Sequence, residues 1–194
     1  GLPMPAGTQQ PDTAESRQRK ALYQLNELAA GFFQKQLLRN DGLSARRYCH
    51  QRGLKKSIVE QYRLGLAPPN WDTLLRAAMN QGWKPALLKA AGLIIEKEKG
   101  GFYDRFRERL MFPIEDARGR IIAFGGRVLG DDLPKYLNSP QTPLFNKSQA
   151  LYGWHQVMKA RNVSSLIVVE GYLDVLSLVQ AGFHGAVATL GTAA

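Results

Sequence analysis

Cysteine and histidine are scarce in this sequence. One cysteine, Cys49, and three histidines are scattered over 194 residues. A lone cysteine cannot form an internal disulfide, which is typical of proteins of the reducing cytoplasm. The scattered histidines give no ligand set for a structural zinc ion. Long apolar runs are missing as well, and neither a membrane span nor a secretory signal peptide is visible. We therefore expect a cytoplasmic protein with no membrane partner.

Basic residues are absent from the last part of the chain. The sequence holds 26 Lys and Arg against 16 Asp and Glu, a net charge of +10, yet no basic residue follows Arg161. Only two acids follow it, so residues 1–161 carry +12 and the remainder carries −2. A basic body joined to an acidic segment indicates a surface that holds a polyanion beside a metal site. The alternative is a basic surface that serves solubility alone.

The acidic segment contains a strand–helix–strand pattern. The apolar run Leu166–Val169 is typical of a strand buried on both faces, and Ala186–Leu190 repeats the pattern after a helical stretch that ends near Gly182. In such a unit Glu170 stands at the carboxyl end of the first strand and Asp174 in the first turn of the helix. Carboxylates at this position suit Mg²⁺ or proton transfer beside it. Alternatively, both acids only favour the positive end of the helix.

The first half of the chain has the pattern of a helical region. Residues 1–12 contain three prolines and no apolar period, which indicates a linker. Asp12 begins a long amphipathic helix that stops near Asn40. Its buried face is predicted to hold Leu22, Leu25, Leu28, Ala29 and Phe32. Short helices follow as far as Gly92.

After Gly101 the period changes to that of strands. Phe106, Leu110, Phe112 and Ile114 are expected on one face, with Arg105, Arg107 and Arg109 on the other. A turn at residues 116–119 leads into a return strand that is expected to end at Gly125-Gly126. These glycines let the backbone approach a ligand, with Arg127 beside it, or else they form a bend with Arg127 in solvent. Residues 131–147 are predicted to be a long polar loop, and residues 148–160 a helix.

Five segments together resemble the bacterial replicative DNA primases of the DnaG type. These are Tyr103–Ile114, Gly119–Arg127, Pro134–Pro140, Leu151–Gly153 and Val169–Asp174. The resemblance implies a mixed α/β fold, with a helical and β-hairpin subdomain followed by the first strand–helix–strand of a Toprim sheet. We assign residues 1–12 to a linker, 13–164 to the basic amino-terminal subdomain and 165–194 to the start of the Toprim domain.

The resemblance also implies a role for each site residue in an enzyme that copies single-stranded DNA into short RNA primers. Glu170 resembles the Toprim glutamate, which binds a divalent metal or moves a proton as the 3′-hydroxyl attacks the α-phosphate. Gly171 and Asp174 complete this motif as supporting residues. Template and nucleotides are expected to contact Arg52, Arg105, Arg107, Arg127, Lys135, Tyr136, Asn138 and Lys147.

The implied cofactor is Mg²⁺ or Mn²⁺, and the implied partners are single-stranded DNA, ribonucleoside triphosphates and the replicative helicase. Zinc and helicase are expected to act through domains absent from this sequence. A Toprim domain also uses an Asp-x-Asp pair, and Asp174 is the only acid after Glu170. We therefore expect this chain to bind single-stranded DNA without full catalysis. Two alternatives are a nucleic-acid-binding module whose acids are structural and the Toprim unit of a topoisomerase or nuclease.

Overall fold

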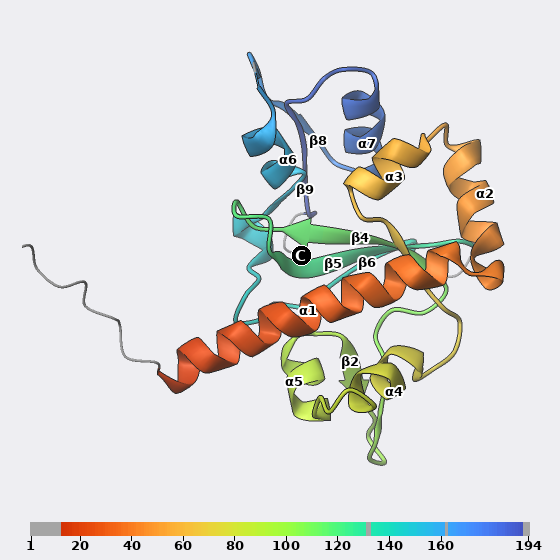
Figure 1. The fold of residues 1–194 in the computed structure, drawn as a ribbon, viewed down its shortest axis with the longest axis vertical. Coiled ribbons are helices and arrows are strands. Elements are labelled where there is room, and N and C mark those ends of the chain that lie inside the picture. The colour runs from red at the N-terminus through yellow and green to blue at the C-terminus, as the bar shows by residue number, and fades with distance from the viewer. Residues whose placement is uncertain (1–12, 131–132, 162, 192–194) are drawn as a thin grey trace, which may run out of the picture.

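A computed structural model describes residues 13–130, 133–161 and 163–191 (Figure 1). The predicted linker, residues 1–12, lies outside the described residues. The helices are α1 (Ala14–Leu38), α2 (Leu43–Gln51), α3 (Lys56–Gln61), α4 (Thr73–Met79), α5 (Pro85–Ala90), α6 (Trp154–Lys159) and α7 (Tyr172–Gln180), with 3-10 turns at Asn40–Gly42 and Lys147–Gln149. The strands are β1 (Gly65–Ala67), β2 (Ile94–Glu96), β3 (Phe102–Asp104), β4 (Arg109–Glu115), β5 (Ile121–Val128), β6 (Tyr136–Asn138), β7 (Leu151–Tyr152), β8 (Ile167–Val169) and β9 (Ala186–Thr189). The mixed α/β fold expected from the sequence is confirmed.

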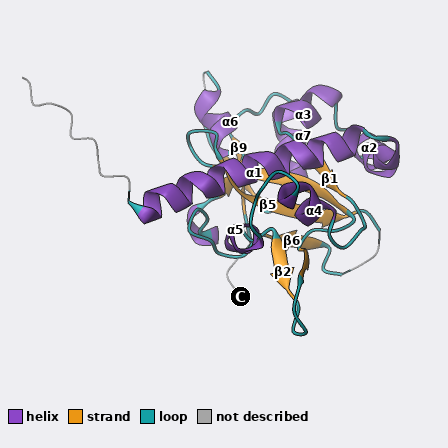
Figure 2. Cartoon of the chain, turned by 60° about the horizontal axis from the view of Figure 1, so that its bottom comes forward, coloured by secondary structure: helices purple, strands orange, loops and turns teal. Residues whose placement is uncertain are grey.

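Helix α1 runs across the molecule and packs on β1 and β5 (Figure 2). The side chain of Thr13 accepts a hydrogen bond of 3.1 Å from the Ser16 amide and caps the helix, whereas the predicted cap Asp12 lies outside the described residues. The sequence pattern predicted that Phe32 lies on the buried face of this helix, but its neighbour Phe33 is the buried residue. The reason is tertiary: Gly65 of β1 has no side chain, and Phe33 fills the space above it. The helix covers one face of the main sheet.

The main sheet is antiparallel with strand order β1-β4-β5-β6. Its central strands β4 and β5 are buried on both faces. Leu110, Phe112 and Ile114 enter one hydrophobic cluster, and Met111 enters the other. The prediction that Arg105, Arg107 and Arg109 form the basic face of one strand is therefore wrong. Strand β3 ends at Asp104 and β4 begins at Arg109, so Arg105 and Arg107 lie in the turn between the two strands.

The glycine pair Gly125-Gly126 lies inside β5 and does not end it, contrary to the sequence prediction. Strand β6, which falls within the predicted long loop, pairs with β5 at this point, with Gly125 opposite Asn138. The predicted helix over residues 148–160 is also shorter, because β7 occupies Leu151–Tyr152 and α6 begins at Trp154. Strands of two or three residues are too short to show a period in sequence, and pairing with a longer strand defines them.

The second sheet has strand order β7-β9-β8, with β8 parallel to β9. The predicted strand–helix–strand unit is confirmed as β8, α7 and β9. Burial of β8 on both faces was predicted wrongly, because Leu166 and Val168 are 52% and 61% exposed. Strand β8 is an edge strand, and only β9 pairs with it among the described strands.

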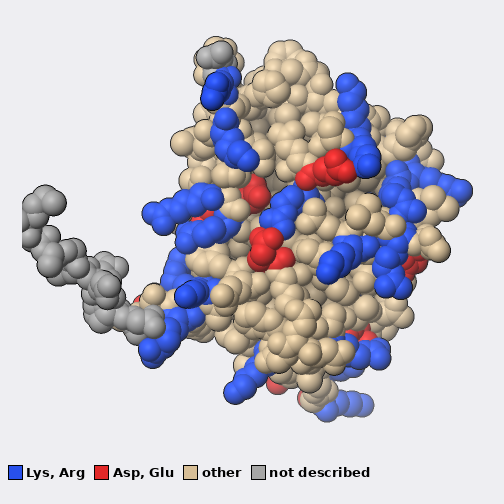
Figure 3. Space-filling view, in the orientation of Figure 1, with Lys and Arg blue, Asp and Glu red and all other residues tan. Residues whose placement is uncertain are grey.

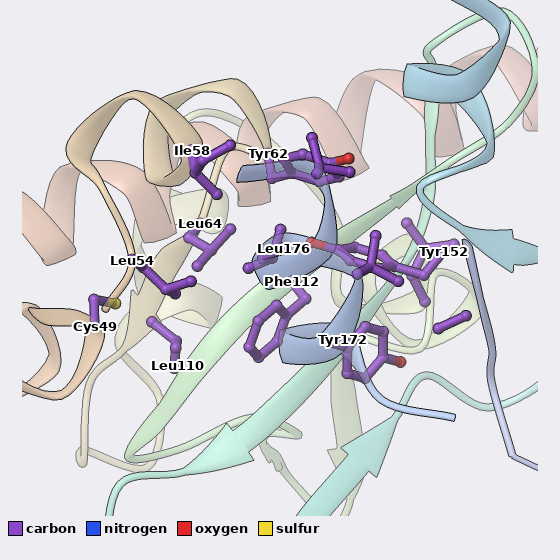
Figure 4. Packing of buried hydrophobic residues seen from close by; sticks show 14 of the residues in the cluster. Cys49, Leu54, Ile58, Tyr62, Leu64, Leu110, Phe112, Tyr152, Tyr172 and Leu176 are labelled. Atoms are coloured by element: carbon purple, nitrogen blue, oxygen red, sulfur yellow. The ribbon is translucent and has the colours of Figure 1, made fainter. Parts of the chain in front are cut away.

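One hydrophobic cluster joins the two sheets (Figure 4). It combines Leu110 and Phe112 of β4 with Tyr152 of β7 and with Tyr172 and Leu176 of α7. The predicted domain boundary at residues 164 and 165 stays a prediction. The unit that follows it is packed firmly against β4. Among the described residues, no helix is long and apolar enough to cross a membrane.

Candidate functional site

The two acids of the predicted metal site stand at adjacent element ends. Glu170 directly follows β8, and Asp174 lies in the first turn of α7, both exposed to solvent. Gly171 is the N-cap of α7, and a Cβ at this residue would lie 2.6 Å from Oδ2 of Asp174. The absence of a side chain at Gly171 therefore lets the Asp174 carboxylate fold back over the helix start. Both predicted supporting residues lie where the sequence placed them.

The donor set suits a hard cation that keeps part of its water shell. Within the described part of the chain, no three His, Cys, Asp or Glu residues come close enough to form a metal cage. Mg²⁺ is commonly held by one or two carboxylates together with waters and substrate phosphates. Glu170 with Asp174 fits that mode of binding, and does not fit a closed site made of protein ligands alone.

Basic residues from three elements meet the start of α7 in one pocket. Its volume is about 270 Å³, and it is lined by Arg52, Arg127, Lys135, Tyr136, Gly171, Leu173, Asp174 and Ser177. Arg52 follows α2, Arg127 belongs to β5, and Lys135 precedes β6. The pocket thus brings four of the predicted binding residues next to the predicted acidic motif. It has the composition to hold phosphate groups beside a metal ion.

Arg127 is the most enclosed cation of this pocket, with 8% of its surface exposed. Its guanidinium lies 4.3 Å from the ring centre of Tyr48 and 5.9 Å from that of Tyr136. Its Nη1 donates to the carbonyl of Val128 at 3.1 Å, and its Nε is buried with no hydrogen-bond partner among the described residues. A buried cationic donor without a partner is costly unless an anion satisfies it.

Tyr48 lies outside the pocket lining but contacts two of its cations, and the sequence analysis missed it. The guanidinium of Arg52, the residue after α2, lies 5.2 Å from the centre of the Tyr48 ring, and the guanidinium of Arg127, on β5, lies 4.3 Å from it. One ring therefore contacts two cations from different elements. Burial raises the pKa of Tyr48, and the two arginines act in the opposite direction. The spacing of Tyr48 and Arg52, one helical turn apart, is a signal that sequence could have offered.

Arg105 and Arg107 lie in a separate groove of about 420 Å³. The guanidinium of Arg107 stands 4.2 Å from the ring centre of Trp71, and Trp71 is 60% exposed. Tyr103 packs edge-on against Trp71 at 5.5 Å and lies 5.1 Å from Arg107. Burial lowers the pKa of Arg105, whose Nε donates to the carbonyl of Asn138 at 3.3 Å. Trp71 is the second residue that the sequence analysis missed.

Asn138 and Lys147 are predicted site residues that do not line the pocket: Asn138 ends β6, and Lys147 begins the 3-10 turn before β7. The Asn138 carboxamide accepts a bond of 2.6 Å from the Tyr172 hydroxyl and donates one of 2.9 Å to the Leu190 carbonyl. The Lys147 ammonium lies close to Gly191, just beyond β9. The structure therefore places Asn138 between protein groups, while Lys147 remains near the carboxyl edge of the second sheet.

Positive charge is not confined to these two sites. Figure 3 shows Lys and Arg side chains spread over both flanks of one face, with fewer Asp and Glu between them. Charge alone therefore does not locate the binding surface. The pocket and the groove stand out because each combines cations with aromatic rings, and the pocket is also lined by the carboxylate of Asp174.

Comparison with known proteins identifies the family of this chain. Residues 32–158 match the family model for the amino-terminal domain of the DNA primase catalytic core, and residues 164–194 match a Toprim domain. The chain is 46% identical over 192 residues to DNA primase of Salmonella typhimurium, covering 98% of this chain and 33% of that protein. It therefore spans about a third of the length of this curated relative.

Two solved structures are similar to the whole described chain. A DnaG primase catalytic domain bound to single-stranded DNA aligns with a TM-score of 0.84 at 46% identity, over 92% of this chain and 58% of that one. The zinc-binding and RNA polymerase domains of Aquifex aeolicus primase align with a TM-score of 0.81 at 31% identity, over 93% of this chain and 44% of that one.

Proposed function

The chain belongs to the DnaG-type bacterial DNA primases and comprises part of their catalytic core, including a segment that matches a Toprim domain. On this premise we propose that it holds template and nucleotide for RNA primer synthesis. The observation that carries the proposal is the pocket in which Arg52, Arg127 and Lys135 face Gly171 and Asp174. Cations beside strand-end carboxylates can bind a triphosphate and a divalent metal together, which template-directed nucleotidyl transfer requires. The topoisomerase and nuclease alternatives are set aside by the family assignment.

In this proposal the pocket binds the incoming ribonucleoside triphosphate. Arg127, Arg52 and Lys135 neutralise phosphate oxygens, and the buried Nε of Arg127 gains the partner it lacks. Lys147 approaches the same ligand from the edge of the second sheet. Tyr136, which is 40% exposed beside Arg127, offers a ring for the base. The cations hold the triphosphate in place while the 3′-hydroxyl of the primer attacks the α-phosphate. The new P–O bond forms as the bond between the α- and β-phosphates breaks, and pyrophosphate leaves.

Glu170 and Asp174 would hold Mg²⁺ or Mn²⁺ at the edge of this pocket, which Asp174 lines and which begins one residue after Glu170, at Gly171. When bound, the metal neutralises charge on the reacting phosphate and favours the deprotonated 3′-hydroxyl. Glu170 supplies the direct carboxylate or accepts the proton, and Asp174 supports it from the first turn of α7. Zinc and the replicative helicase would act through other domains, and the Aquifex relative includes a zinc-binding domain.

The second groove would hold the single-stranded template. Trp71 and Tyr103 provide rings on which bases can stack, and Arg105 and Arg107 provide charge for the backbone. The related DnaG structure is bound to single-stranded DNA, which supports a template surface on this fold.

Two matched variants test the assignment by fluorescence anisotropy with single-stranded DNA. We expect the logarithm of affinity to fall linearly with the logarithm of salt concentration, and Arg107→Ala, which removes a cation of the groove, to reduce that slope by roughly one. Trp71→Ala should weaken binding by about 5- to 150-fold, the range for one lost stacking contact, and leave the slope unchanged. Affinity that does not respond to salt would rule out binding through phosphates, and a wild-type affinity in Trp71→Ala would remove the groove from the template path.

A further inference from the structure

Tyr172 is the first residue of α7 and stands midway between Glu170 and Asp174. Its side chain is 5% exposed and points into the hydrophobic cluster (Figure 4). The ring stacks on Phe112 of β4 with centres 4.8 Å apart and planes at 12°. Tyr152 of β7 meets it edge-on at 4.8 Å. The residue between the two acids is therefore packed against both sheets.

Gly125 provides the space for this ring on the main sheet. A Cβ at Gly125 would lie 2.6 Å from Cε2 of Tyr172, which is shorter than any van der Waals contact. The Tyr172 ring thus lies directly on the backbone of β5, two residues before Arg127. This explains the first glycine of the pair: it accommodates a side chain from α7, where the sequence suggested a ligand.

The Tyr172 hydroxyl makes a directional link across the same position. It donates to Oδ1 of Asn138 at 2.6 Å, and Asn138 pairs with Gly125 across β5 and β6. Nδ2 of Asn138 donates to the carbonyl of Leu190, one residue after β9, at 2.9 Å. One side chain on β6 therefore joins the start of α7 and the end of β9, and it stands three residues from Lys135.

We propose that Tyr172 is a positioning residue, whose hydroxyl sets the carboxylates around the start of α7 at a fixed distance from Arg127 on β5 and Lys135 just before β6. Ring packing is not directional and leaves the ring free to slide over Gly125. The bond to Asn138 is directional and fixes the ring along the strand. The inference rests on the proposed function, because the distance matters only if acids and cations act on one nucleotide.

The test uses a full-length primase that contains this sequence, with the variant Tyr172→Phe. This variant keeps the stacked ring and loses only the hydroxyl. We expect kcat for primer synthesis to fall by about 10- to 100-fold, the cost of displacing reacting groups by around 1 Å. The dissociation constant for single-stranded DNA and the melting temperature should stay close to wild type, because the template groove and the core are unchanged.

Tyr152→Phe is the matched control. The Tyr152 hydroxyl is buried in the same cluster and has no hydrogen-bond partner among the described residues. Its removal should leave kcat unchanged, since no link is lost. A wild-type kcat in Tyr172→Phe, or an equal fall in both variants, would overturn the inference. Absence of primer synthesis by the wild-type protein would overturn the proposed function itself, and the two failures are thus distinguishable.

Hydrogen exchange gives a readout that does not depend on activity. The Val175 amide bonds to the Gly171 carbonyl in the first turn of α7, and the Ala181 amide bonds to the Ser177 carbonyl at its far end. In Tyr172→Phe we expect faster exchange at Val175 and unchanged exchange at Ala181. Wild-type exchange at Val175 would show that the hydroxyl does not hold the start of α7, and would overturn the inference.

Discussion

The guanidinium of Arg127 lies 4.3 Å from the ring centre of Tyr48, and the guanidinium of Arg52 lies 5.2 Å from the same ring. Two like charges on different elements are thus held at one pocket by a single aromatic side chain. The ring offers its negative face to the cations and partly offsets their repulsion. Tyr48 therefore organises the phosphate-binding groups without belonging to the pocket lining.

Replacing Tyr48 by Leu should weaken nucleotide binding and spare the fold. A lost cation–π contact is worth about 0.5–2 kcal/mol, so affinity for a ribonucleoside triphosphate should fall by about 2- to 30-fold. Titration with a fluorescent nucleotide measures the change. Tyr48→Phe keeps the ring face and serves as the control, with affinity near wild type. Unchanged affinity in Tyr48→Leu would mean that the arginines are held by other contacts.

Gly125→Ala should destabilise the protein, because its new Cβ collides with the Tyr172 ring. Overpacking of this kind costs about 1–3 kcal/mol, measured by urea denaturation. Gly31→Ala is the matched control: nothing lies within 4 Å of its Cβ position on α1, and alanine should raise stability by up to about 1 kcal/mol. In a Tyr172→Ala background the cost of Gly125→Ala should shrink. An equal cost in both backgrounds would contradict the collision.

Elements that depend on the local sequence pattern could be predicted from the sequence. Contacts that depend on tertiary packing could not. The unit β8–α7–β9 was predicted because its apolar runs and the change of period are local. The role of Gly125 could not be predicted, since its neighbour Tyr172 is distant in sequence and comes from helix α7. Trp71 was missed for the same reason, because its partner Arg107 reaches it only after the chain returns through β3.

The predicted site residues separate into two places for a similar reason. Arg105 and Arg107 looked like a continuation of the strand that carries Arg109, and a turn directs them to the groove with Trp71 instead. Arg109 itself is buried, with Nη1 donating to the carbonyl of Pro134 at 2.8 Å. Residue type identified the cations, but only the fold assigned them to pocket, groove or scaffold.

The free energy of unfolding should fall as pH rises toward the raised pKa of the Asp104 carboxyl group. Its carboxylate is 2% exposed and accepts from the amides of Leu74 and Leu75 at 2.7 and 2.9 Å. Burial raises its pKa to about 6 from 3.8; Asp72 adds to the rise, while the two amides and Arg107 oppose it. The unfolded chain releases this proton at lower pH than the folded one. The stabilisation is therefore present below about pH 4 and lost between there and pH 6.

Urea denaturation between pH 4 and pH 7 measures this effect, with a limit of roughly 3 kcal/mol for a shift of two pKa units. Asp104→Asn should be less stable at low pH and should lose this part of the pH dependence. Burial also raises the pKa of Glu115, so Glu115→Gln is the control that removes a second contribution of the same sign. A wild-type pH profile in Asp104→Asn would show that Asp104 stays ionised in the fold.

Glu170→Gln should separate catalysis from template binding in a full-length primase that contains this sequence. The substitution keeps size and hydrogen bonding but removes the charge that a metal ion or proton needs. Primer synthesis should fall by at least ~10²-fold, the lower end for a lost proton-transfer group. Affinity for single-stranded DNA should persist, because Trp71 and Arg107 lie in the separate groove.

The same carboxylate gives a second measurement on the 194-residue chain alone. Within its described part no cluster of three acidic or histidine ligands exists, so Mg²⁺ at low millimolar concentration should not raise the melting temperature. We likewise expect no primer synthesis from this chain. Primer synthesis by it would mean that the catalytic carboxylates lie elsewhere than at Glu170 and Asp174. A wild-type rate in the full-length Glu170→Gln protein would instead leave Glu170 with a structural role at the start of α7, since the charge would then matter only to the helix end.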